Sequence, residues 1–196
     1  SFKIVRNQIA TIVVPYSMED LSISGGIETV AAEIGNNRYY TLADAIDAAE
    51  NGDKITLARG VGENIEIPAG KELIIDINKQ NIIGGSVAGK AAITNKGTLT
   101  LINGYISRDN MSNSHYVIEN EGTLILGEEG ELAAGHEELV VETSKGSSSL
   151  IRNNAESAVL TINRGSYTHK NAFLVLKNDL GTLNVNGGVF TTATVS

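Results

Sequence analysis

The chain contains no cysteine and no tryptophan among its 196 residues, and it has only two prolines. The absence of cysteine excludes disulfide bonds, thiolate metal sites and a cysteine nucleophile. Aromatic residues make up 5% of the chain although 41% of it is hydrophobic. The core must therefore consist mainly of isoleucine, leucine, valine and alanine. With 21 glycines, turns are frequent, and few of them have a backbone fixed by proline.

Positive charge is also scarce, because 15 lysines and arginines stand against 23 aspartates and glutamates, for a formal net charge of −8. Nucleic-acid binding requires a positive surface that displaces counterions, so we exclude a nucleic-acid partner. Apolar runs such as Ile12–Val14 are far shorter than the roughly 20 residues that span a membrane. The first fifteen residues also lack the continuous apolar stretch of a secretory signal. We therefore expect no membrane insertion and no secretion by that route.

A short pattern recurs along the chain. The segment "ITNKGTLTLINGYI" (93–106) returns as "IENEGTLILGEEGEL" (118–132) and as "LKNDLGTLNVNGGVF" (176–190). Its centre is a pair of apolar residues two positions apart, and the first members of successive pairs are 20, 24, 25, 36 and 23 residues apart. A period in the twenties indicates a solenoid. The pairs are Ile55/Leu57, Ile75/Ile77, Leu99/Leu101, Leu124/Leu126, Leu160/Ile162 and Leu183/Val185.

The surroundings of these pairs favour strands over helices, because they are rich in threonine and β-branched residues and are punctuated by glycine. We predict an all-β fold, a single-stranded right-handed parallel β-helix with about three short strands per turn, since parallel crossovers are almost always right-handed. In this fold Leu99, Leu124, Leu160 and Leu183 form one interior column.

An asparagine precedes each of the last four pairs, and a glycine follows each of them, with an apolar residue two positions beyond the glycine. The asparagines are expected to stack as an amide ladder at one corner, the alternative being ordinary turn asparagines. The ladder residues are Asn95, Asn120, Asn153 and Asn178. The glycines are Gly104, Gly130, Gly165 and Gly188, and the apolar residues that follow them are Ile106, Leu132, Tyr167 and Phe190.

Residues 29–196 are predicted to form the β-helix domain, which begins with a capping helix over residues 41–51. Thr41 is the expected N-cap, with Asp44 three positions on, and Asn51-Gly52 is the expected stop. The wide spacing between Leu124 and Leu160 indicates an insertion over residues 127–149. It contains an extra strand in "ELVVE", and insertions in solenoids are often on the binding face.

Residues 1–28 form a separate N-terminal arm that is β-rich and roughly alternating up to Pro15. One short strand cannot bury a core alone. The arm either pairs with an edge of the main domain, attaches the protein to a partner such as a capsid or another subunit, or is disordered. Its expected contact residues are Phe2, Ile4, Ile9, Ile12 and Val14.

Residues 30–82, with Ile34-Gly35, Tyr40-Thr41-Leu42, Gly52-Asp53, Glu63-Asn64-Ile65 and Gly70-Lys71, resemble the opening of pectate-lyase-like right-handed β-helix modules. The resemblance extends to about residue 110 and continues beyond it only as the repeat. Such modules occur in surface proteins of Gram-positive bacteria and in phage particles. The resemblance implies a helix that caps the first turn, and display or binding more often than catalysis.

The residues give little sign of chemistry. General acid–base cleavage of glycans needs two carboxyls at a set separation, and no two of the seven aspartates (20, 44, 47, 53, 76, 109 and 179) fall on matching positions of adjacent turns. We expect no catalytic residue, no cofactor and no metal site. The histidines at 115, 136 and 169 are expected to face solvent, as is the acidic cluster from Glu128 to Glu142. Tyr105, expected to point outward, is the first candidate for contact with a glycan.

These observations predict a non-catalytic structural protein on the surface of a virion, either a capsid decoration or a fibre-like protein anchored by its arm. The alternative is a fragment of a Gram-positive adhesin on the bacterial surface that binds glycan or a host surface, and a polysaccharide lyase or hydrolase is the least favoured. The last strands leave an open edge, for which we expect either self-association or further sequence.

Overall fold

The computed structural model describes residues 29–85, 87–108, 115–146, 148–171 and 174–193. The predicted arm, residues 1–28, lies outside the described residues, together with its expected contact residues Phe2, Ile4, Ile9, Ile12 and Val14. The described part of the chain is mostly β and forms a parallel β-solenoid of about five turns, here called coils. The predicted fold is therefore confirmed.

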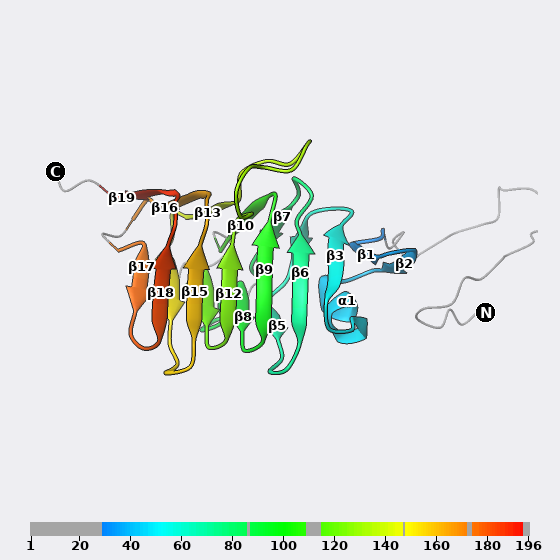
Figure 1. The fold of residues 1–196 in the computed structure, drawn as a ribbon, viewed down its shortest axis with the longest axis horizontal. Coiled ribbons are helices and arrows are strands. Elements are labelled where there is room, and N and C mark those ends of the chain that lie inside the picture. Colours follow the sequence, from blue (N-terminus) through cyan, green and yellow to red (C-terminus); the bar gives the residue numbers. More distant parts are fainter. Residues whose placement is uncertain (1–28, 86, 109–114, 147, 172–173, 194–196) are drawn as a thin grey trace, which may run out of the picture.

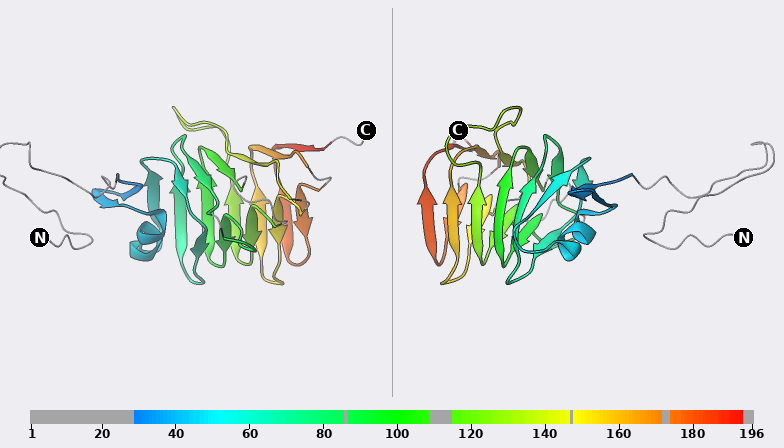
Figure 2. Two further views of the ribbon diagram at one scale, coloured as in Figure 1. Left: turned by 180° about the vertical axis from the view of Figure 1, so that it is seen from behind. Right: turned by 45° about the vertical axis from the view of Figure 1, so that its right-hand side comes forward.

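Each coil runs through one strand of each of three sheets, here called sheets 1, 2 and 3. In Figure 1 the strands of sheet 1 point upward in front, sheet 2 crosses the top, and sheet 3 returns behind, while the coils advance from right to left in a right-handed sense. Figure 2 shows the same body from behind. The parallel strands of sheet 1 are β3 (Asp53–Leu57), β6 (Glu72–Asp76), β9 (Thr98–Ile102), β12 (Thr123–Leu126), β15 (Val159–Ile162) and β18 (Thr182–Val185).

Sheets 2 and 3 are also parallel throughout their described strands, with adjacent strands one coil apart. Sheet 2 consists of β4 (Val61–Gly62), β7 (Asn81–Ile83), β10 (Tyr105–Ser107), β13 (Val140–Thr143), β16 (Ser166–His169) and β19 (Val189–Thr192). Sheet 3 consists of β5 (Ile65–Ile67), β8 (Ile93–Asn95), β11 (Ile118–Asn120), β14 (Ile151–Asn153) and β17 (Leu176–Asn178).

The register between coils places like residues on top of one another. Leu99, Leu124, Leu160 and Leu183 form one column of sheet 1, as predicted. The first three of these side chains are at most 1% exposed. Because side chains alternate between the two faces of a strand, the residue two positions further on forms a second buried column in the same sheet.

The interior column of sheet 3 is Ile65–Ile93–Ile118–Ile151–Leu176, and that of sheet 2 ends in Val141–Tyr167–Phe190. The core of the protein is the set of these columns, which meet along the axis of the solenoid.

Two details of the predicted register are wrong. Leu99 pairs with Leu73, not with Ile75, so the pair Ile75/Ile77 sits two residues further along its strand than the later pairs do. In sheet 2, Val141 occupies the column position expected for Leu132. In both coils the corner between the sheet 1 strand and the sheet 2 strand is longer than in the coil of Leu99. A prediction that assumes a constant spacing between repeats therefore assigns the wrong residue to the column.

The structure also revises the insertion predicted at residues 127–149. The segment "ELVVE" contributes β13, which is the regular sheet 2 strand of its coil and not an extra strand. The departure from the repeat is the segment 127–139, here called the excursion, which connects β12 to β13 and rises above the body in Figures 1 and 2.

A helix closes the N-terminal end of the solenoid. Helix α1 (Leu42–Ala48) buries Leu42, Ala45 and Ile46, and two antiparallel strands, β1 (Ala32–Ile34) and β2 (Asn37–Tyr39), extend sheet 1 beside it. Thr41 is the N-cap, and its hydroxyl accepts the Asp44 N–H at 3.0 Å. The helix ends earlier than predicted, because Ala49 is already extended and the chain then turns into β3.

Two charged side chains from the first two coils hold the ends of α1. The Glu63 carboxylate accepts the N–H groups of Leu42 and Ala43, each at 3.0 Å. The Lys71 ammonium donates to the carbonyls of Ile46 (3.0 Å) and Asp47 (3.1 Å), and also to that of Ala49. A negative charge at the N-terminus of a helix and a positive charge at its C-terminus both interact favourably with the helix dipole.

The other end of the solenoid has no such cover among the described residues. The side chains of β18 and β19 are largely exposed, and Val185 and Val189 are 50% and 64% exposed. The interior column that contains Ile162 therefore ends in Val185, an apolar side chain left half exposed at this end. We call residues 174–193 the terminal coil.

The same substitution should cost different amounts along one column. Leu124→Ala, in the middle of the solenoid, should lower the free energy of unfolding by about 2–5 kcal/mol, because it leaves a cavity between two coils. With both substitutions made in the chain without residues 1–28, Leu183→Ala should cost well under half as much, because Leu183 is only partly buried there. Urea unfolding of both variants measures the difference, and equal losses would contradict the open end.

Candidate functional site

The four predicted ladder asparagines come together at the corner between sheets 3 and 1. The side-chain amide of Asn95 donates to Asn120 Oδ1 at 2.8 Å, that of Asn120 to Asn153 Oδ1 at 2.7 Å, and that of Asn153 to Asn178 Oδ1 at 2.8 Å. The first three side chains are fully buried. An amide suits this position because it both donates and accepts, so that identical side chains satisfy one another.

Each rung also binds the backbone of the next coil. Asn120 Nδ2 donates to the Val159 carbonyl at 3.2 Å, and Asn153 Nδ2 donates to the Thr182 carbonyl at 3.1 Å. These carbonyls belong to the first residue of the next sheet 1 strand. The ladder thus fixes where each sheet 1 strand begins relative to the sheet 3 strand of the preceding coil.

The excursion is held to the body at the corner between sheets 1 and 2. His136 Nδ1 lies 2.7 Å from Glu128 Oε1 and its Nε2 lies 3.7 Å from Asp76 Oδ2, so the imidazole bridges two carboxylates. The side chain of Asn103 reinforces the contact, since its Nδ2 donates to Asp76 Oδ1 at 2.8 Å and its Oδ1 accepts the Glu137 N–H at 2.9 Å.

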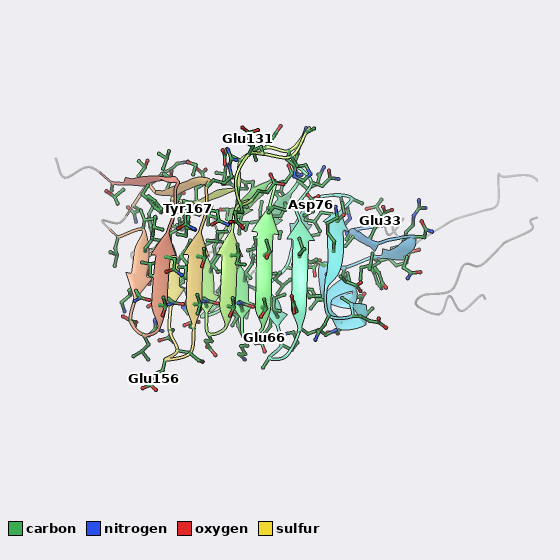
Figure 3. All side chains as sticks on the ribbon, in the orientation of Figure 1. Glu33, Glu66, Asp76, Glu131, Glu156 and Tyr167 are labelled. Carbon is green, nitrogen blue, oxygen red and sulfur yellow. The ribbon has the colours of Figure 1, made fainter. Side chains whose placement is uncertain are left out.

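Asp76 is the buried centre of this group. Its carboxylate is 6% exposed, accepts the Asn78 N–H at 2.9 Å and lies 3.7 Å from Lys54 Nζ. Figure 3 shows Asp76 at the top of its strand and Glu131 out on the excursion. Glu129 and Glu131 are exposed, so the excursion presents acidic side chains to solvent while His136, Asn103 and Asp76 hold it to the body.

Arg164 secures the other side of the excursion. Its guanidinium donates to both carboxylate oxygens of Glu138, at 2.7 and 3.0 Å to Oε1 and 3.1 Å to Oε2, and to the Gly130 carbonyl at 2.7 Å. The hydrogen bond to Glu138 raises the pKa of Arg164. Because Arg164 lies between β15 and β16, this contact joins the excursion to the next coil.

Charged side chains on the outside of sheet 3 also pair between coils. Arg152 donates to Glu119 at 3.0 Å on one side and to Asp179 at 2.8 Å on the other, and it lies over the Tyr116 ring. Lys177 lies 2.9 Å from the same Asp179, and this hydrogen bond lowers the pKa of Asp179.

Tyr105 lies on the outer side of β10, where it is partly buried. Its hydroxyl donates to Glu142 Oε1 at 3.0 Å, and the same carboxylate oxygen lies 2.8 Å from Lys170 Nζ. A shallow polar groove of about 310 Å³ runs elsewhere, along the sheet 3–sheet 1 corner, and is lined in part by Lys71, Lys96 and Glu121. The structure does not bring the candidate aromatic and the groove together.

The expectation that the histidines face solvent is wrong. His169 is fully buried in β16, and the side chains of His115 and His136 are 21% and 23% exposed and lie against carboxylates. Burial lowers the pKa of His115. The sequence gives no signal for these contacts, because the carboxylates Glu128 and Asp76 meet His136 only through the path of the excursion.

In the part of the chain that the structure describes, no cluster of histidine, aspartate and glutamate side chains could hold a metal ion. Within the same residues, α1 is too short to cross a membrane, and no other helix has the length and apolar character to do so.

Comparison of the chain with protein-family models, with curated proteins and with solved structures gave no match.

The ladder can be predicted from the repeat, whereas the two clamps on α1, which are the contacts of Glu63 and Lys71 with its ends, cannot. In the sequence, Glu63 and Lys71 stand out only as matching residues of the resemblance, and their contact with α1 follows from the fold. The signal available for them is that each is a charged residue one coil away from the helix that it caps.

The ladder should be sensitive to charge. Asn120→Ala should lower the free energy of unfolding by about 1–3 kcal/mol, because it leaves neighbouring polar groups without partners. Asn120→Asp should cost about 3–5 kcal/mol at neutral pH, because a carboxylate cannot donate and would be a buried charge. Asn184→Asp on the exposed side of β18 is the control and should change stability by less than about 0.5 kcal/mol. If Asn120→Asp were no worse than Asn120→Ala, the ladder would not depend on the donor.

The histidine bridge should hold the excursion rigid. His136→Ala should accelerate hydrogen exchange of the amides in residues 128–139 by roughly tenfold, because two contacts worth about 1 kcal/mol or less each are lost. His115→Ala, which removes the same side chain at another corner, should leave the exchange of these residues unchanged. Exchange that is insensitive to His136 would show that Arg164 and Asn103 hold the excursion without it.

Proposed function

We propose that the chain is a non-catalytic structural protein whose solenoid is displayed on the outside of a particle and which residues 1–28 attach to that particle. Among such roles we propose a phage virion accessory protein, as a capsid decoration or fibre-like protein. The resemblance of residues 30–110 to β-helix modules of phage particles and Gram-positive surface proteins supports this class. The parallel solenoid is the fold that such modules share.

The observation that carries the proposal is the use made of the carboxylates. Glu119, Glu138 and Glu142 each pair with a basic side chain that follows in the next coil, at 3.0, 2.7 and 2.8 Å. Asp76 joins the body to the excursion. Side chains that would be needed as acid and base in a glycan-cleaving enzyme are here arranged to connect successive coils, as suits a rigid shaft.

The excursion is the part of the body best placed for display. It stands out from the solenoid (Figure 2), is anchored at both sides by His136 and Arg164, and carries exposed glutamates at positions 129, 131 and 137. A loop that is anchored in this way loses little conformational entropy when a partner binds it. We therefore propose the excursion as the presented surface.

Immunogold electron microscopy tests the proposal. Antibodies against the solenoid should label intact phage particles that contain the full chain. Particles assembled with a chain that lacks residues 1–28 should not be labelled. The matched control is the chain with Glu129 and Glu131 changed to Gln, which should remain attached. Labelling of the bacterial cell wall alone would favour the adhesin reading, and unchanged labelling without residues 1–28 would refute the attachment role.

An enzymatic assay tests the other part of the proposal. The purified chain should release no reducing ends and no unsaturated products from a panel of acidic and neutral polysaccharides above the level of a heat-denatured sample. Turnover that is lost in Asp76→Asn but kept in Asp44→Asn would overturn the non-catalytic role.

A further inference from the structure

The terminal coil ends with the features of an interior coil. Its strands β17 and β18 pair with the coil before them in the same register as all earlier coils. Their other edges have no partner strand among the described residues, and the apolar side chains of Leu180, Val185 and Phe190 are 46%, 50% and 38% exposed at this end. An end coil of a solenoid normally carries a polar outer face or a cap, so this surface has the chemistry of one that is covered.

The asparagine ladder is unfinished at the same place. Asn95, Asn120 and Asn153 each donate to the next asparagine and to the first carbonyl of the next sheet 1 strand. Asn178 Nδ2 makes neither of these contacts within the described residues and donates to the Gly181 carbonyl at 3.3 Å. The next rung would require an asparagine oxygen and a backbone carbonyl at the spacing of Asn178 and Thr182, the two residues that Asn153 contacts.

The N-terminal segment has this spacing in its sequence. Residues 4–14, "IVRNQIATIVV", align without a gap with residues 175–185, "VLKNDLGTLNV", which form β17, the corner and β18. Asparagine, threonine and valine are identical at positions 7, 11 and 14, and the apolar residues Ile4, Val5, Ile9 and Ile12 match apolar ones. Arg6 matches Lys177, and Ala10 matches Gly181.

We propose that residues 4–14 of the same chain form an additional half coil on the terminal coil. Val5–Asn7 would pair with β17 and Thr11–Val14 with β18, so that Asn7 becomes the next rung of the ladder. Ile12 and Val14 would then cover Leu183 and Val185. This inference goes beyond the proposed function, and attachment through residues 1–28 would then require residues 4–14 to leave the terminal coil.

The corner of the half coil is compatible with the residues present. Ala10 aligns with Gly181, which has a φ of +84° and where a Cβ would meet the Ala158 carbonyl oxygen at 2.3 Å. The preceding coil nevertheless has an alanine, Ala158, at the same corner position, so the fold accepts alanine there. Arg6 would follow Arg152 and Lys177 in a column where Asp179 already bridges two cations. Pro15 has no backbone N–H to donate to a neighbouring strand of sheet 1, so the proposed strand ends at Val14.

The chain is long enough for its own segment to reach. Residues 15–28 provide 14 residues, which extend to about 48 Å. The path from the new layer back to β1, which follows residues 15–28 in the chain, crosses seven layers of about 4.8 Å, or roughly 34 Å. Tethering at this length gives an effective concentration in the millimolar range, which exceeds that of other copies in dilute solution.

Engineered disulfides test the register. The chain has no cysteine, so V13C/N184C introduces two thiols on the outward side of adjacent layers, about 4.8 Å apart. This double variant should form an intramolecular disulfide under mild oxidation at least about tenfold faster than V13C/T161C. The control places the thiols two layers apart, about 9.6 Å, beyond the reach of a disulfide. Thiol counts and non-reducing electrophoresis at several protein concentrations give the rates.

The outcomes separate the candidate occupants. Equal rates in the two variants would refute the predicted register, and disulfides formed only between chains would refute the assignment to the chain's own segment. Because the assay uses the purified chain without any particle, its failure would leave the proposed attachment role untouched.

A second measurement does not depend on cysteines. Hydrogen exchange of the β18 amides should be at least about tenfold faster in the chain without residues 1–14 than in the full chain, and I12D should have the same effect. V13D, on the outward side of the same predicted strand, is the matched control and should exchange as the full chain does. Protection of β18 that is the same in all four proteins would overturn the proposal.

Discussion

The parallel, in-register contact between successive coils is the interaction on which the rest of the structure depends. Ordering a coil of about 25 residues costs roughly 1–2 kcal/mol per residue, and the few aliphatic side chains inside it return about 1.5–3 kcal/mol each. A single coil is therefore unstable alone. It becomes stable only through the strand pairing and side-chain columns that it shares with neighbours on both sides, and this makes the two ends the places where the fold needs special solutions.

The same register decides which polar groups the interior accepts. A buried column repeats one residue type at a spacing of about 4.8 Å, so a carboxylate or an ammonium would meet its own charge in the next coil. An amide meets a complementary group, and Asn95, Asn120 and Asn153 are accordingly buried without penalty. On the outside, where opposite charges can meet between coils as Glu119 and Arg152 do, the register produces ion pairs instead. Each such pair contributes little at the surface, and their common effect is to favour one register over a shifted one.

What could be predicted from the sequence follows from this distinction. Features that repeat, such as the leucine column and the asparagine ladder, are visible because each coil reports the same constraint again. Features that occur once are not: the register of Leu73, the place of Val141 and the contacts of His136 depend on corner lengths and on the path of the excursion. The clamps on α1 lie between these cases, because Glu63 and Lys71 come from coils whose position is predictable while the helix direction is not.

The two ends of the solenoid show how the fold handles the loss of a neighbour. At the N-terminal end the repeat is replaced, because β1 runs antiparallel to β3 and α1 packs its apolar face on the first coil. Glu63 and Lys71 bind the two ends of α1 and stabilise its dipole. At the other end the repeat is not replaced, since residues 175–185 keep the threonine, the asparagine and the alternating apolar residues of an interior coil. Asn178 and Val185 therefore leave a hydrogen-bond donor and an apolar side chain at a surface that one more layer would cover. Residues 4–14 carry a second copy of the same spacing, and in the proposed half coil they are that layer.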